Sequence, residues 1–161
     1  APIPFETFIL RKWTPVSKRI IKHESRTQNR QRAFNKDYFS EDELINTFSP
    51  LFECVEYLHA NNVVHGQIHP ENIVFVNEEI KLRDWLIEFH DNAYYAYSKK
   101  ENRSKFDDFV ALGQIMTQYA TLRKSPEPFQ DRDIPTAIES IIDSYSKNFI
   151  ILLLVLLKRK T

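Results

Sequence analysis

Residues 65–75, His65-Gly66-Gln67-Ile68-His69-Pro70-Glu71-Asn72-Ile73-Val74-Phe75, decide the fold of this chain. Pro70 has no backbone N–H and disfavours a helical conformation in His69 before it, so a helix is not expected to run through this point. The apolar run at 73–76 is followed, after Asn77-Glu78-Glu79, by a second apolar run at 80–82. Two short apolar runs joined by polar residues predict a β-hairpin directly after the loop.

Helices are predicted on both sides of this loop and hairpin. Ser40 and Glu43 fit the S-x-x-E capping box. Apolar residues then recur at helical spacing, which predicts a helix from Ser40 to about residue 60: Leu44, Ile45, Phe48, Leu51, Phe52, Val55 and Leu58. The same periodicity predicts a helix over 106–121, another follows Pro135, and residues 5–13 are apolar enough for a short strand. Together these elements predict an α+β fold that is mostly helical.

The composition of the 161 residues narrows the possible functions. The formal net charge is zero, which gives no overall attraction to nucleic acid or to a membrane surface. Gly66 and Gly113 are the only glycines, so neither a G-x-G-x-x-G phosphate loop nor a Walker A loop can be built from this chain. Cys54 is the single cysteine, so no disulfide can form within the chain. We therefore expect an intracellular protein of the cytoplasm.

Two unusual segments leave alternatives open. Residues 11–36 are strongly basic and would suit phosphate contacts, but residues 37–56 are acidic. This layout favours solvated faces or a protein-binding patch over nucleic-acid binding. The apolar run at 149–157 is shorter than the roughly 20 residues that a membrane span needs. It is interpreted as a buried helix end or as a truncated or mistranslated end, with an interfacial anchor the least favoured alternative.

The stretch around Gln67 resembles the catalytic loop of eukaryotic protein kinases, H-R-D-L-K-P-E-N followed by an apolar strand. Other segments resemble kinase elements in the same order. Residues 56–59 resemble the end of the helix before that loop, and residues 80–86 resemble the strand leading into the magnesium-binding D-F-G. Residues 107–113 resemble the D-x-W-S-L-G of the helix that anchors the larger lobe. The resemblance covers roughly residues 5–145.

The resemblance implies the C-terminal lobe of a protein kinase, with one or two small β-hairpins and with the N-lobe absent from this chain. It places a kinase-like domain portion over residues 1–146, starting near the hinge. Residues 147–161 are then an apolar and basic tail of uncertain status.

Several catalytic positions differ from the family pattern. Gln67 occupies the position of the catalytic aspartate, and an amide has no carboxylate to accept or orient the substrate hydroxyl's proton. Gly66 stands where the family has an arginine that pairs with activation-loop phosphate. His69 stands where the family has a lysine that contacts the transferred phosphate. Residues 84–86 keep the aspartate of D-F-G but replace its Phe and Gly by Trp and Leu.

Other family positions are retained. Asn72 and Asp84 match the two magnesium ligands and are vestigial metal candidates; the favoured alternative is that both hydrogen-bond the loop backbone. His65 and Asp108 match the pair that ties the catalytic loop to the anchoring helix, and Gly113 matches a helix-packing glycine. Most retained positions are thus structural, whereas the proton-handling position is changed.

The resemblance therefore implies a catalytically impaired pseudokinase with no intact catalytic residue, which acts in protein binding or regulation. The expected partner is a protein, either an active kinase or a missing N-lobe; neither nucleic acid nor a membrane span is expected. No cofactor is expected either, and Mg²⁺ and ATP would enter only if the native protein has an N-lobe. The alternative is a divergent Ser/Thr-type kinase fragment with residual Mg-ATP-dependent phosphotransfer.

Two more groups of side chains suggest other functions. A zinc site is disfavoured because the spacing fits no compact zinc motif; its candidate ligands are Cys54, His59, His65 and His69. Four residues in the short segment before Asp108 are candidate phosphorylation sites: Tyr94, Tyr95, Tyr97 and Ser98. The favoured alternative is that these side chains only pack against the fold.

Overall fold

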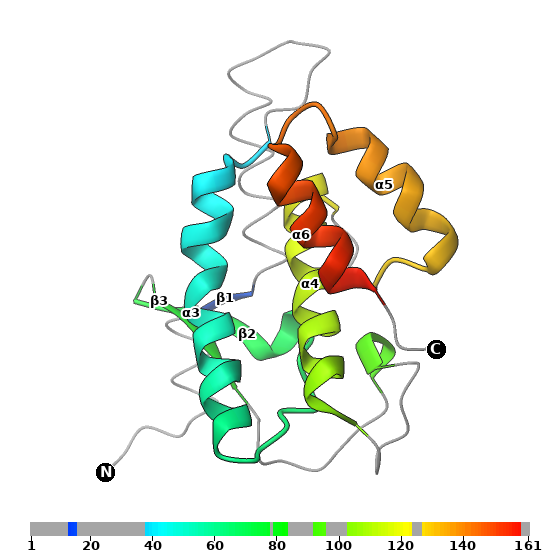
Figure 1. Ribbon diagram of the computed structural model, residues 1–161. Helices are drawn as coiled ribbons and strands as arrows, with labels where there is room; N and C mark the ends of the chain where they lie inside the picture. The colour runs from blue at the N-terminus through cyan, green and yellow to red at the C-terminus, as the bar shows by residue number, and fades with distance from the viewer. Residues whose placement is uncertain are drawn as a thin grey trace.

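Helix α4 (Lys105–Thr121) is the centre of the fold. The computed structural model describes residues 13–15, 38–77, 79–83, 92–95, 103–123 and 127–158. Within these residues α4 contacts α3 (Glu41–Ala60), α5 (Ile134–Ile141) and α6 (Lys147–Leu157). Figure 1 shows α3 running beside α4, α6 crossing α4, and α5 on the side of α4 away from α3. The prediction of a mostly helical α+β fold is confirmed.

A small antiparallel sheet lies beside α3. Its strand order is β1 (Trp13–Pro15), β2 (Ile73–Val76), β3 (Glu79–Leu82). The β2–β3 pair is the predicted hairpin, with Val74 opposite Lys81. Of the strand predicted over residues 5–13, only Trp13 lies in the described part of the chain. Strand β1 begins at Trp13, continues to Pro15 and pairs with β2. The local sequence pattern did not reveal this long-range pairing.

The start of α3 has the Ser40 half of the predicted capping box. The Ser40 hydroxyl accepts a hydrogen bond from the Glu43 N–H at 3.1 Å, and three acidic residues in the first turn suit the helix dipole. The apolar face of α3 is buried in the core: Leu44, Phe48, Leu51 and Val55. The helix ends at Ala60, and Asn62 then takes a left-handed conformation with φ 60°. This turn sends the chain into the loop at 63–69.

Helix α4 is buried on all sides between Val110 and Ala120. Ser104 and Asp107 form a reciprocal capping box at its start, with the Ser104 N–H donating to the Asp107 carboxylate at 2.7 Å. A helix without a solvated face needs packing partners around its whole circumference. These are supplied by α3, α5 and α6, together with the short 3₁₀ turn η2 (Ala93–Tyr95).

The apolar run near the C-terminus forms helix α6, which packs on α4. Ser146 caps its start by accepting from the Phe149 N–H at 3.2 Å. One face is buried: Phe149, Ile150, Leu153 and Leu157. The helices approach closely at Gly113, where a Cβ would lie 2.5 Å from the Cβ of Leu156. Residues 149–157 thus lie in a helix with one buried apolar face, and the apolar side chains of its other face are exposed: Ile151, Leu152, Leu154 and Val155.

Candidate functional site

The loop that resembles the kinase catalytic loop is held by one buried carboxylate, that of Asp108 on α4. Its Oδ2 accepts from the backbone N–H of His65 and from His59 Nε2, both at 2.8 Å. Its Oδ1 accepts from the Gly66 N–H at 2.9 Å and from the Tyr95 hydroxyl at 2.7 Å. Each oxygen thus has two donors, which satisfies an ionised carboxylate fully. Asp108 therefore acts as a structural anchor of the loop, and its lone pairs are already used.

His65 contributes to the loop through both its backbone and its ring. The ring is buried, and its Nδ1 accepts from the Gln67 N–H at 3.1 Å. Because Nδ1 is an acceptor, the ring hydrogen lies on Nε2, which donates to the Arg83 carbonyl at 3.0 Å. His65 therefore joins the loop to the residue that follows β3. The predicted pairing of His65 with Asp108 is made by the His65 backbone.

Tyr95 is the link that sequence reasoning did not assign to the site. Its hydroxyl donates to Asp108 and accepts from the Ile68 N–H at 3.2 Å. Burial, and after it the nearby Asp108 carboxylate, raises the pKa of this phenol well above its usual value, so it keeps its proton. The Arg103 guanidinium lies over the Tyr95 ring at 4.8 Å and donates to the Gly66 carbonyl.

Replacing Tyr95 with phenylalanine is expected to lower the free energy of unfolding by about 1–3 kcal/mol, because the Ile68 N–H would lose its buried acceptor. Urea denaturation followed by circular dichroism measures the change. Tyr57→Phe is the matched control, since that side chain is 70% exposed and should change stability by less than about 0.5 kcal/mol. Equal stability of the two variants would refute the bridging role of the hydroxyl.

Gln67 lies at the centre of the loop and is buried, with 5% exposure. The backbone carbonyl of Gln67 accepts a hydrogen bond from the Asn72 side-chain amide at 2.7 Å. Gly66 before it has φ 74°, a left-handed conformation that glycine adopts without steric penalty. His69 Nδ1 accepts from the Glu71 N–H at 3.2 Å and so caps the 3₁₀ turn η1 (Pro70–Asn72). Gly66, Gln67 and His69 therefore supply neither a carboxylate nor a fixed positive charge to the loop.

Asn72 is used at both ends of its side chain. Its amide nitrogen donates to Gln67, and its Oδ1 lies 3.5 Å from the Nε of Arg83. These contacts match the alternative in which Asn72 hydrogen-bonds the loop. Asp84, the other magnesium candidate, lies outside the described residues. Among the residues that the structure describes, no three His, Cys, Asp or Glu side chains form a group that could hold a metal ion.

The remaining candidates from the sequence are placed as follows. The three histidines of the zinc hypothesis have separate protein partners, at Asp108, Gln67 and Glu71. Tyr94 is buried like Tyr95, and its hydroxyl is 3.0 Å from the Gln118 side-chain oxygen. These contacts agree with packing roles for the two tyrosines. Tyr97 and Ser98 lie outside the described residues.

Comparison with known proteins identifies the protein family to which the chain belongs. The protein kinase domain family matches residues 18–99, just over half of the chain. The chain therefore belongs to the protein kinase domain family. It contains no helix, within the described residues, that is long and apolar enough to cross a membrane.

Curated relatives are similar over part of their length. The chain is 32% identical over 142 residues to the membrane-associated tyrosine- and threonine-specific cdc2-inhibitory kinase wee-1.3 of Caenorhabditis briggsae, covering 78% of this chain and 20% of that one. It is 42% identical over 65 residues to a probable myosin light chain kinase of Dictyostelium discoideum, covering 38% of this chain and 14% of that one. The chain thus spans a fifth or less of these two relatives.

Among solved structures, the chain has the fold of part of a pseudokinase. The Neurospora crassa PAN3 pseudokinase matches with a TM-score of 0.66 at 16% identity, over 92% of this chain and 34% of that one. The same protein in complex with PAN2 matches with a TM-score of 0.64 at 15% identity, over the same shares of the two chains. At this identity the likeness shows the fold alone.

Proposed function

We propose that this chain is part of a catalytically impaired pseudokinase that acts by binding or regulating a protein partner. The observation that carries the proposal is the buried Gln67 in a loop whose frame is otherwise intact. In an active kinase the aspartate at this position accepts or orients the substrate hydroxyl's proton. A glutamine amide has no basic oxygen for this at any usable pH.

The neighbouring residues support the same conclusion. The Asp108 carboxylate accepts from the loop backbone, and its four accepted hydrogen bonds leave it unsuited to act as a base. His69, at the position of the phosphate-contacting lysine, is turned back onto Glu71. The loop is thus built to keep its shape, and its chemistry has been lost.

The C-lobe assignment and the partner are part of the proposal. The 34% share of the PAN3 chain that this fold covers agrees with one lobe of a kinase-like domain. The PAN3 structure in complex with PAN2 provides a precedent for protein binding by that pseudokinase. The proposed partner of this chain is an active kinase or an N-lobe that completes the domain. No cofactor is part of the proposal, and Mg²⁺ and ATP would enter only if the native protein has an N-lobe.

Phosphate transfer by the wild type separates this proposal from the alternative, a divergent kinase with residual phosphotransfer. In the full-length gene product with Mg-ATP and a protein substrate, the wild type should transfer no phosphate above a Gln67→Ala control. Gln67→Asp restores the missing carboxylate and tests whether the rest of the site is competent. Wild-type turnover on the order of 1–100 per second, as in ordinary kinases, would overturn the proposal and establish the alternative.

A further inference from the structure

Helix α6 presents a ridge of apolar side chains to solvent, on the side that does not pack on α4. Figure 1 shows α6 in front of α4, on the outside of the helices. With about 100° between successive residues of a helix, the exposed apolar side chains share this side of α6 with a lysine near each end. We call this side the α6 ridge, and its exposed residues are Lys147, Ile151, Leu152, Leu154, Val155 and Lys158.

The ridge concentrates apolar surface that the fold leaves uncovered. Of the eight large apolar side chains that are exposed in the described residues, four belong to it, and Val155 has 62% exposure. An apolar patch of this kind marks an interaction site. The four side chains are all aliphatic and carry no ring or hydrogen-bonding group. Protein interfaces draw most of their binding energy from Trp, Tyr and Arg, so the ridge suits an apolar medium better than a shaped protein surface.

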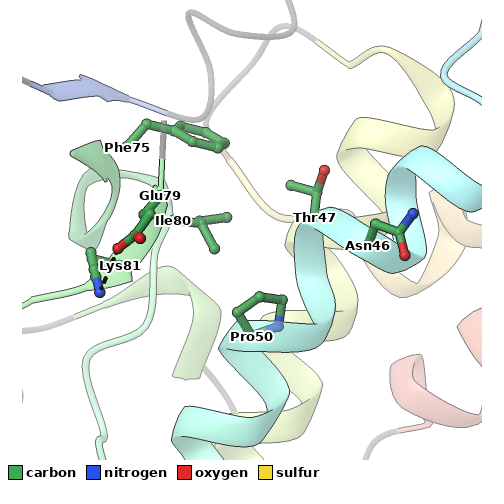
Figure 2. A pocket seen from close by; sticks show the side chains of 7 residues that line it. All are labelled: Asn46, Thr47, Pro50, Phe75, Glu79, Ile80 and Lys81. Atoms are coloured by element: carbon green, nitrogen blue, oxygen red, sulfur yellow. Dashed lines mark ion pairs between the residues drawn. The ribbon is translucent and has the colours of Figure 1, made fainter. Parts of the chain in front are cut away.

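The ridge and the residues after it are positively charged. Residues 144–161 contain no acidic residue, although the whole chain has a formal net charge of zero, and their cations are Lys147, Lys158, Arg159 and Lys160. The lysine that forms an ion pair within the described residues is Lys81, 3.2 Å from Glu79 beside α3 (Figure 2). The two lysines of the ridge have no such partner there, so their charges are available to an anionic ligand.

The positive charge is strongest at the carboxyl end of α6. Acidic groups lie at the amino end, where the Glu41 carboxylate accepts from the Ser146 N–H at 2.8 Å and Asp143 precedes the helix. At the carboxyl end Lys158 is followed in the sequence by two more cations. An anionic surface would therefore be drawn to the carboxyl end first.

A second copy of the chain does not suit the ridge. If two α6 ridges packed antiparallel, Lys147 of one copy would face Lys158 of the other. If they packed parallel, each lysine would face its own counterpart. Since α6 contains no acidic side chain, neither arrangement offsets the repulsion between like charges.

The length of α6 decides how it would lie on a membrane. Its 11 residues extend about 16 Å, which is too short to cross a hydrocarbon core of about 30 Å. A short helix with an apolar side and lysines at its ends lies along the interface instead, with its apolar side chains at the boundary between headgroups and acyl chains. The lysine stems reach along this boundary and keep their ammonium groups among the headgroups.

We infer that the α6 ridge binds the surface of an anionic lipid bilayer. Ile151, Leu154 and Val155 enter the boundary region, while Lys158 and the two cations after it contact the anionic headgroups. This is the interfacial anchor that the sequence alone favours least; the exposed ridge, which only the fold reveals, supports it. The inference goes beyond the proposed function and does not depend on it.

Vesicle flotation with the full-length protein tests the inference. We expect the wild type to bind phosphatidylcholine vesicles with about 30% phosphatidylserine at least about tenfold more strongly than pure phosphatidylcholine vesicles, at about 0.15 M salt. Val155→Glu places a carboxylate in the apolar boundary and should weaken binding at least about tenfold. The matched control, Tyr57→Glu, adds the same charge in the last turn of α3, at a side chain with 70% exposure, and should leave binding within about twofold.

A second variant tests the contribution of the cations. Replacing both Lys147 and Lys158 with glutamine keeps the apolar side chains, and because each lysine near an anionic surface strengthens binding by roughly a factor of five, binding should weaken at least about tenfold. Circular dichroism checks that each variant is folded.

Several results would overturn the inference. They are equal binding to the neutral and anionic vesicles, equal binding by Val155→Glu and Tyr57→Glu, and no flotation of the wild type at about 1 mM lipid. Self-association that Val155→Glu abolishes in analytical ultracentrifugation would overturn it too, since the occupant of the ridge is then a second copy. Phosphotransfer by the wild type bears on the proposed function alone.

Discussion

Replacing Asp108 with alanine is expected to lower the free energy of unfolding by about 3–5 kcal/mol, the loss typical of breaking a buried, fully paired charge. The side chain is 0% exposed and accepts four hydrogen bonds, two of them from the backbone N–H groups of His65 and Gly66. Alanine would leave both N–H groups buried without an acceptor, and each such group destabilises the fold. Urea denaturation followed by circular dichroism measures the change.

Two further variants make this prediction decisive. Asp108→Asn keeps one acceptor oxygen in the same place and should lose less stability than Asp108→Ala, so it gives a graded value if alanine prevents folding. Asp107→Ala removes the neighbouring carboxylate, which caps α4, and should cost about 1 kcal/mol. If Asp108→Ala were no more destabilised than Asp107→Ala, the anchoring role of Asp108 would be wrong.

Leu153→Ala is expected to lower the free energy of unfolding by about 2–5 kcal/mol, because the side chain is 0% exposed and alanine would leave a cavity between α6 and α4. Leu154→Ala makes the same chemical change one residue later, where the side chain is 44% exposed. That control should lose less than about 1 kcal/mol. Denaturant unfolding of the two proteins measures the difference, and equal losses would mean that α6 is not docked in solution.

The helices and the hairpin were predictable because their signals are local. Period-3.6 apolar patterns and the Ser40 cap predict α3, and two short apolar runs with a polar turn predict β2 and β3. The position of the loop followed from its resemblance to a known family. A further local signal, the Ser104-x-x-Asp107 capping box, would have fixed the start of α4.

The connections around the loop could not be predicted in the same way. His59, Tyr95 and Arg103 come from three separate segments and converge on Asp108 or Gly66 only in the folded chain. Nothing in the local sequence distinguishes a tyrosine that bridges two buried groups from one that only packs. The same holds for β1, whose partner strand lies far along the chain. Long-range geometry of this kind depends on the whole fold.

The burial of Tyr95 has a consequence for how the protein is controlled. A tyrosine kinase must bring the target hydroxyl into its own active site, but this hydroxyl lies in the interior, between Ile68 and Asp108, on a side chain with 3% exposure. A phosphate there would also add negative charge beside a buried carboxylate. Phosphorylation of Tyr95 would therefore require this part of the loop to open first, so that the hydroxyl leaves Ile68 and Asp108.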